Sequence, residues 1–222
     1  MTLTVVCLWI KRRCAQPYTV AYVERLRNMV ARHLSLPHRF VCMTDTPERL
    51  PAGIDGVPIK RFRTLLPWWL KLKLFSDAMG WSGRLLYLDL DVVVVGSLDE
   101  IATFPRPFAL LPDMAPNFPR SRKAPWLKVV HRYNSSVMVL DSGTRPELWS
   151  DWTRFAGYRL RSDQDWIGER CPNEATFPAA WFERLKAHTA PPFDPGLKVL
   201  LAIKLKNARA EAMLPWVRDY WR

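Results

Sequence analysis

The chain has 222 residues, 49% of them hydrophobic, which suits one domain with a sizeable core. Its 33 lysines and arginines exceed its 21 aspartates and glutamates, and the net charge of +12 implies an acidic partner, such as a nucleoside diphosphate or an anionic lipid surface. The sequence contains no apolar run of the roughly 18 residues that span a membrane and none of the usual nucleic-acid-binding motifs, so both of those classes are disfavoured.

The amino-terminal stretch 2–10 is apolar and predicts a first strand. No positive residue precedes it and no small-residue cleavage site follows it, which argues against a signal peptide. The cysteines show no metal-ligand spacing, and Cys7 and Cys42 lie in strand-like runs that predict buried thiols. Nothing in this pattern requires an oxidising compartment, so we expect a cytoplasmic protein, with peripheral contact with an anionic membrane left open.

Hydrophobic periodicity predicts that strands and helices alternate along the rest of the chain. Further strands are expected at 39–43, 57–59, 85–88, 108–111, 136–140 and 198–202. Helices are expected at 18–34, 68–79, 146–155 and 162–166, a loop over the active face at 112–128, and a helix or tail at 214–222. The strand–helix–strand opening implies parallel strands joined by a right-handed crossover, so the expected fold class is α/β.

The stretch 83–96, GRLLYLDLDVVVVG, predicts a buried strand that delivers two carboxylates, Asp89 and Asp91. In an extended chain residues i and i+2 point to the same side, so both carboxylates should emerge together where the strand ends, which is where open α/β sheets bind ligands. Two like charges there call for a cation, and Mn²⁺ or Mg²⁺ is the simplest candidate because both prefer oxygen ligands. The alternative is a strand end with two solvated aspartates.

Four motifs follow one another in order: WWLKLKLF at 68–75, LYLDLD at 86–91, YNSSVMVLDSG at 133–143 and SDQDWIGE at 162–169. This order resembles that of the GT-A glycosyltransferases, most closely the family 8 type and its small bacterial relatives. The resemblance implies a single GT-A domain over 1–222, a Rossmann-like fold whose mainly parallel mixed sheet is flanked by helices. It also implies metal-assisted transfer of a hexose from a nucleoside-diphosphate sugar, for which we favour a UDP-sugar, to an unidentified carbohydrate, lipid-linked or protein acceptor.

The resemblance assigns metal binding to Asp89 and Asp91. It assigns donor binding to a second set of residues, which are Tyr18, Lys71, Asp89, Asn134 and Ser135. Each of the others has a plainer reading: Lys71 as a solvated helix lysine, Tyr18 as a core residue, and the Asn134–Ser135 pair as a polar turn before a strand. The family has glycine at the position of Ser136, so the backbone here is expected to approach the sugar less closely.

The resemblance places Asp163 and Gln164 beside the reacting sugar carbon as catalytic residues. A carboxylate there could stabilise oxocarbenium character or orient the acceptor. The plainer reading is a helix start that Ser162 caps, with acidic residues in the first turn. An inverting enzyme needs a carboxylate base, for which Asp163, Asp165 and Glu169 are all candidates, whereas the resemblance favours retention.

The carboxyl-terminal region departs from the family pattern. The family carries a late H-x-x-G-x-x-K-P segment, but the corresponding stretch 199–216 has no histidine and no glycine. Lys204 and Lys206 remain there and are expected to cover the diphosphate. The third protein ligand to the metal is then missing, and either His188 or water and donor oxygens would complete the shell.

Three other functions stay open. The first is a non-catalytic nucleotide-sugar or glycan-binding module on a GT-A scaffold. The second is a nucleotidyltransferase, which the glycine-free stretch 8–18 disfavours because it lacks a phosphate loop. The third is a lectin-like role, with Trp68, Trp69 and Trp166 lining an acceptor groove, although core packing explains most of the eleven tryptophans.

Overall fold

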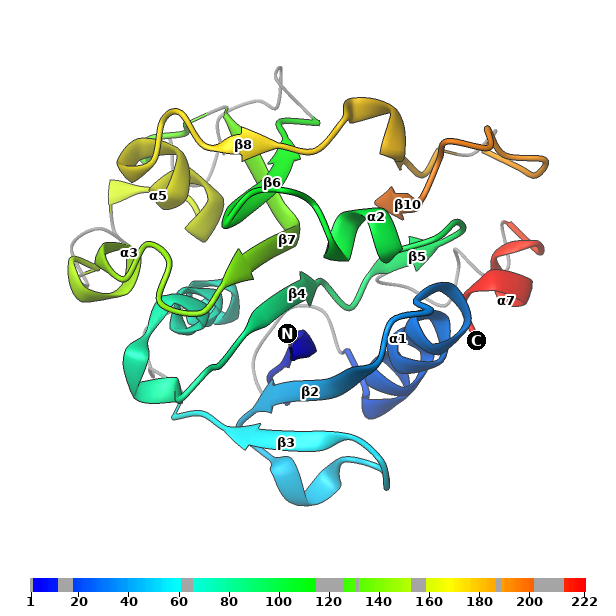
Figure 1. Ribbon diagram of the computed structural model, residues 1–222, viewed down its shortest axis with the longest axis horizontal. Coiled ribbons are helices and arrows are strands. Elements are labelled where there is room, and N and C mark those ends of the chain that lie inside the picture. Colours follow the sequence, from blue (N-terminus) through cyan, green and yellow to red (C-terminus); the bar gives the residue numbers. More distant parts are fainter. Residues whose placement is uncertain are drawn as a thin grey trace.

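A seven-stranded mixed sheet runs through the molecule in the order β3-β2-β1-β4-β7-β6-β8 (Figure 1). The computed structural model describes residues 2–11, 18–60, 66–114, 126–130, 132–152, 159–186, 189–201 and 214–222. The strands of this sheet are β1 (Leu3–Trp9), β2 (His38–Thr44), β3 (Asp55–Pro58), β4 (Arg84–Leu88), β6 (Phe108–Pro112), β7 (Tyr133–Asp141) and β8 (Ala175–Thr176). Strands β3, β2, β1 and β4 pair in parallel, while β7 runs antiparallel to both β4 and β6.

A second, three-stranded sheet is joined to the first through the chain that follows β4. It has the order β5-β10-β9 and is formed by β5 (Val92–Val94), β10 (Val199–Leu201) and β9 (Phe182–Arg184). The chain therefore leaves one sheet after Leu88 and enters the other at Val92. The intervening residues include both aspartates of the central motif.

Both faces of the large sheet are covered, as the apolar run of β4 predicts. Leu86 and Leu88 point into one core, while Leu85 and Tyr87 point into the other, which is the alternation of an extended strand. The first core is closed by α1 (Val20–His33), through its buried residues Val23, Leu26, Met29 and Val30. The second is closed by η2 (Pro67–Phe75), α3 (Glu147–Ser150) and α5 (Asp163–Arg170).

The remaining elements are short. They are η1 (Pro47–Arg49), η3 (Asp77–Met79), α2 (Asp99–Ala102), η4 (Ala179–Trp181) and α7 (Val217–Tyr220). Figure 1 shows α7 and the carboxyl terminus beside α1, and α3 and α5 together on the opposite side of the molecule. Cys7 and Cys42 are buried free thiols, as predicted. Within the residues described, no helix is long and apolar enough to cross a membrane.

The prediction of one α-helix at 68–79 is wrong. The structure has two 3₁₀ helices there, η2 and η3, separated by Ser76 in an extended conformation with φ −91° and ψ 124°. Six of the nine residues of η2 are buried, so the segment has no solvent face of the kind that an amphipathic α-helix presents. Gly80 ends η3 in the left-handed conformation, which agrees with its predicted role as a stop.

Two of the other differences from the predicted boundaries concern β7 and α3. Strand β7 begins at Tyr133 rather than at residue 136, because its pairing with β6 extends to Pro112 and takes in Asn134. The expected helix at 146–155 is a single turn, Glu147–Ser150, and residues 153–158 lie outside the described part of the chain. The polar pair before β7 is therefore part of the strand, not a turn ahead of it.

The close approach of Gly83 to Thr2, just before β4 begins, can be tested by mutation. Gly83 has a φ of +73°, and a Cβ atom there would overlap the Thr2 carbonyl oxygen, which accepts the Arg84 N–H group. Gly143 has a similar φ of +79° but no atom within 4 Å of such a Cβ. We expect Gly83→Ala to lower the free energy of unfolding in urea by about 2–4 kcal/mol and Gly143→Ala by about 1 kcal/mol. Equal losses would contradict the close approach to Thr2.

Candidate active site

The aspartate pair lies in a turn between the two sheets. The Asp89 N–H group donates to the Ser136 carbonyl oxygen at 2.8 Å, which extends the pairing of β4 with β7 by one residue. Leu90 and Asp91 form the turn that leads into β5. Because Leu90 and Asp91 lie in a turn, strand alternation does not by itself set the directions of the two carboxylates. They still lie near each other, since the charge of Asp91 also raises the pKa of Lys71 and that of Asp89 also raises the pKa of Tyr18. Each carboxylate meets groups from a different element.

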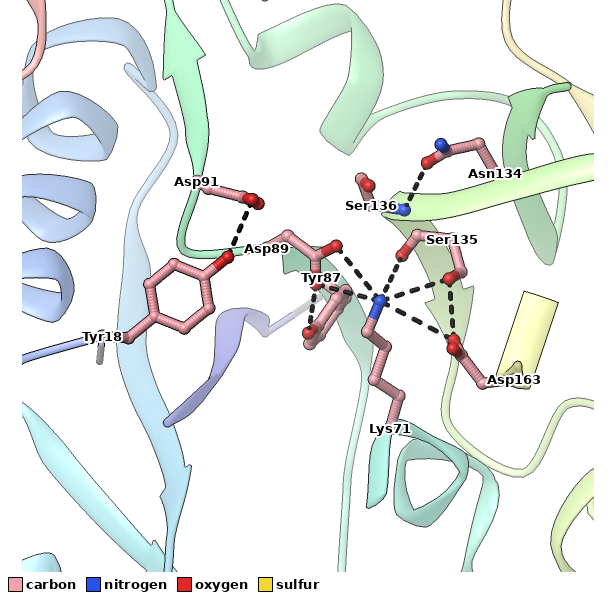
Figure 2. Close-up of polar contacts among 9 residues, drawn as sticks. All are labelled: Tyr18, Lys71, Tyr87, Asp89, Asp91, Asn134, Ser135, Ser136 and Asp163. Atoms are coloured by element: carbon pink, nitrogen blue, oxygen red, sulfur yellow. Dashed lines mark hydrogen bonds and ion pairs between the residues drawn. The ribbon is translucent and has the colours of Figure 1, made fainter. Parts of the chain in front are cut away.

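Asp89 is bound by Lys71, a buried cation that η2 supplies. The Lys71 Nζ atom lies 2.9 Å from Asp89 Oδ1 and 3.1 Å from Asp89 Oδ2 (Figure 2). The Tyr87 hydroxyl also donates to Asp89 Oδ1, at 2.8 Å. Only 8% of the Lys71 side chain is exposed, which rules out the solvated helix lysine. The positive group expected beside the aspartate pair is thus supplied, at least for Asp89, by the protein itself.

The same ammonium group connects Asp89 to α5 and β7. Its Nζ atom lies 3.6 Å from Asp163 Oδ2 and 3.2 Å from the Ser135 hydroxyl oxygen. The Ser135 hydroxyl donates to Asp163 Oδ2 at 2.7 Å, so it bridges the lysine and the carboxylate. These four residues, which we call the Lys71 cluster, are Lys71, Asp89, Ser135 and Asp163. They come from four separate segments of the chain, as Figure 2 shows.

The electrostatics of the cluster keep Lys71 charged. Burial alone would lower the pKa of Lys71, but the negative charges of Asp163 and Asp89 outweigh this effect and raise it. Burial raises the pKa of Asp163, although Lys71 and the hydrogen bond from Ser135 oppose the rise. Burial also raises the pKa of Tyr87, which keeps its hydroxyl a hydrogen-bond donor to Asp89. The cluster therefore holds one cation among two carboxylates with little solvent.

Asp91 lies on the other side of this arrangement, beside Tyr18. The Tyr18 hydroxyl donates to Asp91 Oδ2 at 2.8 Å (Figure 2). Burial and the nearby Asp91 charge raise the pKa of Tyr18, so the phenol stays protonated. The Trp9 indole N–H group fixes the backbone by donating to the Tyr18 carbonyl oxygen at 2.8 Å. Tyr18 is half-buried, so part of its surface remains open.

The other predicted site residues lie around the cluster. Asn134 is half-buried and its Oδ1 atom accepts the Ser136 N–H group at 2.8 Å, whereas Ser135 points into the protein. Gln164 is half-buried in the first turn of α5. Lys204 and Lys206 lie outside the residues described, as does His188.

The other carboxylates of α5 have structural partners. Asp165 is fully buried and accepts the Val130 N–H group and the Ser162 hydroxyl, each at 2.7 Å. The Ser162 side chain thus binds Asp165 instead of capping the backbone of the helix. Glu169 forms ion pairs with Lys128 and Arg159. Asp163 is therefore the one of the three candidate carboxylates that belongs to the Lys71 cluster.

Two of the three tryptophans expected at an acceptor groove are core residues. Trp69 is 2% exposed and stacks on Trp152 at 6.1 Å between ring centroids. Trp166 is 5% exposed, and its indole N–H group donates to the Leu148 carbonyl oxygen at 2.9 Å. Trp68 is half-buried. Trp69 and Trp166 are therefore too buried to line the acceptor groove that the sequence suggested.

The side chains that could ligate a metal ion suit a hard cation only in part. Among the residues described, no three histidine, cysteine, aspartate or glutamate side chains are grouped so that they could hold a metal. Asp89 and Asp91 offer the carboxylate oxygens that Mn²⁺ and Mg²⁺ prefer, so two protein ligands fit, and Mg²⁺ commonly keeps several waters. Asp89 already shares its charge with Lys71, which leaves Asp91 as the carboxylate outside that buried ion pair.

A cavity of about 590 Å³ lies at the opposite edge of the sheet. It is lined by the first residues of β1 and β4, Leu3 and Arg84, and by Asp141 at the end of β7. Arg84 is already bonded there to the carbonyl oxygens of Ala102 and Arg106 and to Asp141. This cavity is separate from the Lys71 cluster, which lies beyond the carboxyl end of β4.

Comparisons with known proteins identify the fold. No family model and no curated protein sequence matches the chain. Among solved structures, an active-site mutant of LgtC in which a glutamine is replaced by glutamate is 12% identical and has a TM-score of 0.61, with 97% of this chain and 95% of that chain covered. The galactosyltransferase LgtC in complex with donor and acceptor sugar analogues is 13% identical, with a TM-score of 0.58 and coverage of 99% and 96%. The predicted GT-A fold is thus confirmed.

Replacing the buried lysine tests the energetics of the cluster. Lys71→Met leaves Asp89 and Asp163 without their cation, and we expect the free energy of unfolding to fall by roughly 3–5 kcal/mol at pH 7.5. Lys71 lowers the pKa of Asp163, so its loss raises that pKa further above the unfolded value. The folded variant then binds a proton more readily than the unfolded chain, and its deficit should shrink as the pH falls.

Urea unfolding of the wild type and Lys71→Met at pH 5 and pH 7.5 measures this change. Adding Asp163→Asn to Lys71→Met should recover part of the loss, because it removes the buried negative charge. A small loss that is the same at both pH values would show that the lysine does not neutralise these carboxylates.

Proposed function

We propose that this protein is a glycosyltransferase that moves a hexose from a nucleoside-diphosphate sugar, in the first instance a UDP-sugar, to an acceptor hydroxyl group. The observation that supports this most is the buried Lys71 cluster at the carboxyl end of β4, in a fold shared with LgtC. That edge of the sheet is where open α/β folds bind ligands. The acceptor is a carbohydrate, a lipid-linked sugar or a protein.

The donor would lie across the turn that holds Asp89 and Asp91. Tyr18 is half-buried beside Asp91 and presents an aromatic ring to the nucleotide. Asn134 is half-buried at the start of β7 and offers its amide to a sugar hydroxyl. Lys204 and Lys206 join this proposal from the sequence alone, as cations for the diphosphate.

Asp89 and Asp91 would hold Mn²⁺ or Mg²⁺. When bound, such an ion neutralises the charge that builds on the leaving diphosphate. The protein prepares this end of the site by fixing Asp89 with the Lys71 ammonium and the Tyr87 hydroxyl. Asp89 therefore does not need to reorganise when the charged donor arrives.

Asp163 would act on the sugar end of the donor. Its carboxylate lies in a nearly dry site, where its pKa rises, and Lys71 and Ser135 favour its ionised form. A fixed negative charge stabilises the positive character that develops on the sugar carbon during transfer. Gln164 follows directly on α5, and an active-site glutamine is the residue changed in one LgtC structure. We therefore assign Gln164 to the sugar-binding wall beside Asp163.

A second candidate is a nucleotide-sugar-binding module without turnover. It is favoured by the hydrogen bonds that already engage both aspartates, Asp89 with Lys71 and Asp91 with Tyr18. It is favoured also by the lack of a third metal-ligating side chain among the described residues. Binding and turnover have to be measured separately to distinguish the two candidates.

Isothermal titration with UDP, with and without Mn²⁺, tests the donor site. We expect metal-dependent binding to the wild type and at least a tenfold weaker affinity for Asp91→Ala, since that carboxylate lies outside the buried ion pair. Asp55→Asn is the matched control, because Asp55 is an exposed aspartate that pairs only with Arg39 in the contacts described. If UDP gives no heat, GDP, CDP and dTDP follow, and no binding of any of them would refute the donor assignment.

Turnover is tested by donor hydrolysis and transfer with Asp163→Asn. The amide keeps the shape of the side chain and can still accept the Ser135 hydrogen bond, but it carries no charge. We expect the rate to fall about a hundredfold or more while UDP binding changes less than threefold. Unchanged hydrolysis by this variant would argue against Asp163, and a wild type that binds UDP but turns over no donor would support the binding module.

A further inference from the structure

The carboxyl-terminal residues of the described chain are anchored on α1 (Figure 1). Arg32 of α1 donates to the carbonyl oxygens of Tyr220 and Arg222, at 2.6 Å and 2.8 Å. The Trp221 N–H group donates to the Val217 carbonyl oxygen at 2.7 Å, and the Trp221 side chain is 3% exposed. This segment thus contributes a buried indole ring to the surface of α1.

A continuous series of aromatic contacts leads from that indole to the aspartate pair. The Trp221 ring packs edge-on against Tyr22, with 4.7 Å between centroids and 73° between planes. Tyr22 packs in the same way against Tyr18, at 5.0 Å and 73°. The Tyr18 hydroxyl then donates to Asp91 at 2.8 Å. Edge-to-face pairs have a defined geometry, so each ring restricts the orientation of the next.

Both ends of this series are fixed. The Arg25 guanidinium lies 4.3 Å from the centroid of the Trp221 ring, a cation–π contact that adds to its burial. At the other end, Tyr18 lies two residues before α1, and the Trp9 indole N–H group donates to its carbonyl oxygen at 2.8 Å. Loss of the Trp221 ring would leave Tyr22 without its neighbour on that side and so loosen Tyr18.

A second connection joins the same segment to the turn. Helix α7, which precedes Trp221, packs on β5, and its Val217 is fully buried in the core that β5 shares. Strand β5 begins at Val92, directly after Asp91. The terminal segment therefore supports Asp91 from the backbone side as well as through Tyr18.

From these contacts we infer that Trp221 is a positioning residue for the donor site: through Tyr22 it orients Tyr18, and through Tyr18 it holds Asp91. The expected effect of Trp221 on nucleotide binding rests on the proposed function, whereas the series of aromatic contacts does not. In the contacts described, Trp221 touches neither Asp91 nor the Lys71 cluster, and the two tyrosines connect its ring to Asp91.

The contact series is tested without any ligand by ¹⁹F NMR. The six tyrosines are replaced by 3-fluorotyrosine, and Tyr18→Phe identifies the Tyr18 resonance. In Trp221→Leu, which keeps an apolar side chain but removes the ring, the Tyr18 resonance should shift or broaden, and Trp221→Phe should restore it. Tyr220→Leu is the matched control, because Tyr220 packs on Phe193 and Trp216 instead. If Trp221→Leu moves the Tyr22 resonance alone, the inference is overturned.

The effect on the donor site is measured by titrating the same variants with UDP and Mn²⁺. Trp221→Leu should weaken binding about 3- to 10-fold, the range expected for one aromatic pair, and Trp221→Phe and Tyr220→Leu should bind within twofold of the wild type. Urea unfolding verifies that each variant is folded, and Arg25→Gln, which keeps the core intact, should give a smaller change in the same direction.

The two proposals can fail independently. If the Tyr18 resonance responds to Trp221→Leu but no nucleotide binds to the wild type, the contact series stands and the proposed function falls. If the wild type binds UDP through Asp91 and Trp221→Leu binds equally well with an unchanged Tyr18 resonance, the proposed function stands and the role of Trp221 is refuted.

Discussion

The buried ion pair between Lys71 and two carboxylates is the constraint on which the candidate site depends. A charged ammonium group with 8% of its side chain exposed is unfavourable unless its partners are close and correctly placed. Asp89 and Asp163 meet that condition, and Ser135 completes the hydrogen bonding. The positions of η2, β7, α5 and the turn after β4 are therefore linked, because each of them supplies one of these groups.

Because of this ion pair, the two aspartates of the central motif have different surroundings. Asp89 is held on the side of η2 by the lysine, while Asp91 is held on the side of α1 by Tyr18. The change from one sheet to the other between Leu88 and Val92 creates this division, since the turn directs the two side chains to groups from different layers. One carboxylate stabilises the interior and the other lies outside the buried ion pair.

Much of the fold could be predicted from the sequence because it depends on local patterns. The alternation of β4, the apolar stripe of α1 and the left-handed glycine after η3 each follow from one short stretch. The type of η2 could not be predicted in this way, because its burial on nearly all sides depends on distant elements. The length of β7 likewise depends on pairing with Pro112, which the sequence of β7 alone does not contain.

The residues of the candidate site could be named from the sequence, but their contacts could not. Resemblance brought Lys71, Asp89 and Asp163 together as candidates, yet only the structure places one ammonium group among both carboxylates. The contact of Trp221 with Tyr22 could not be predicted, since no motif connects a tryptophan near residue 220 to a tyrosine near the first strand. The sequence feature that could have pointed to this contact is the pair of basic residues Arg25 and Arg32 on α1. In the structure both contact the carboxyl-terminal segment.

The Lys71 cluster also affects which parts of the molecule can unfold separately. Its four groups lie between residues 71 and 163, and the 3₁₀ segment η2 that carries the lysine has weaker hydrogen-bond geometry than an α-helix. If η2 separated by itself, it would leave two carboxylates in the interior without a cation. Partial unfolding of that segment is thereby coupled to the unfolding of β4 and β7, and the site behaves as one cooperative unit instead of a flexible rim on a rigid sheet.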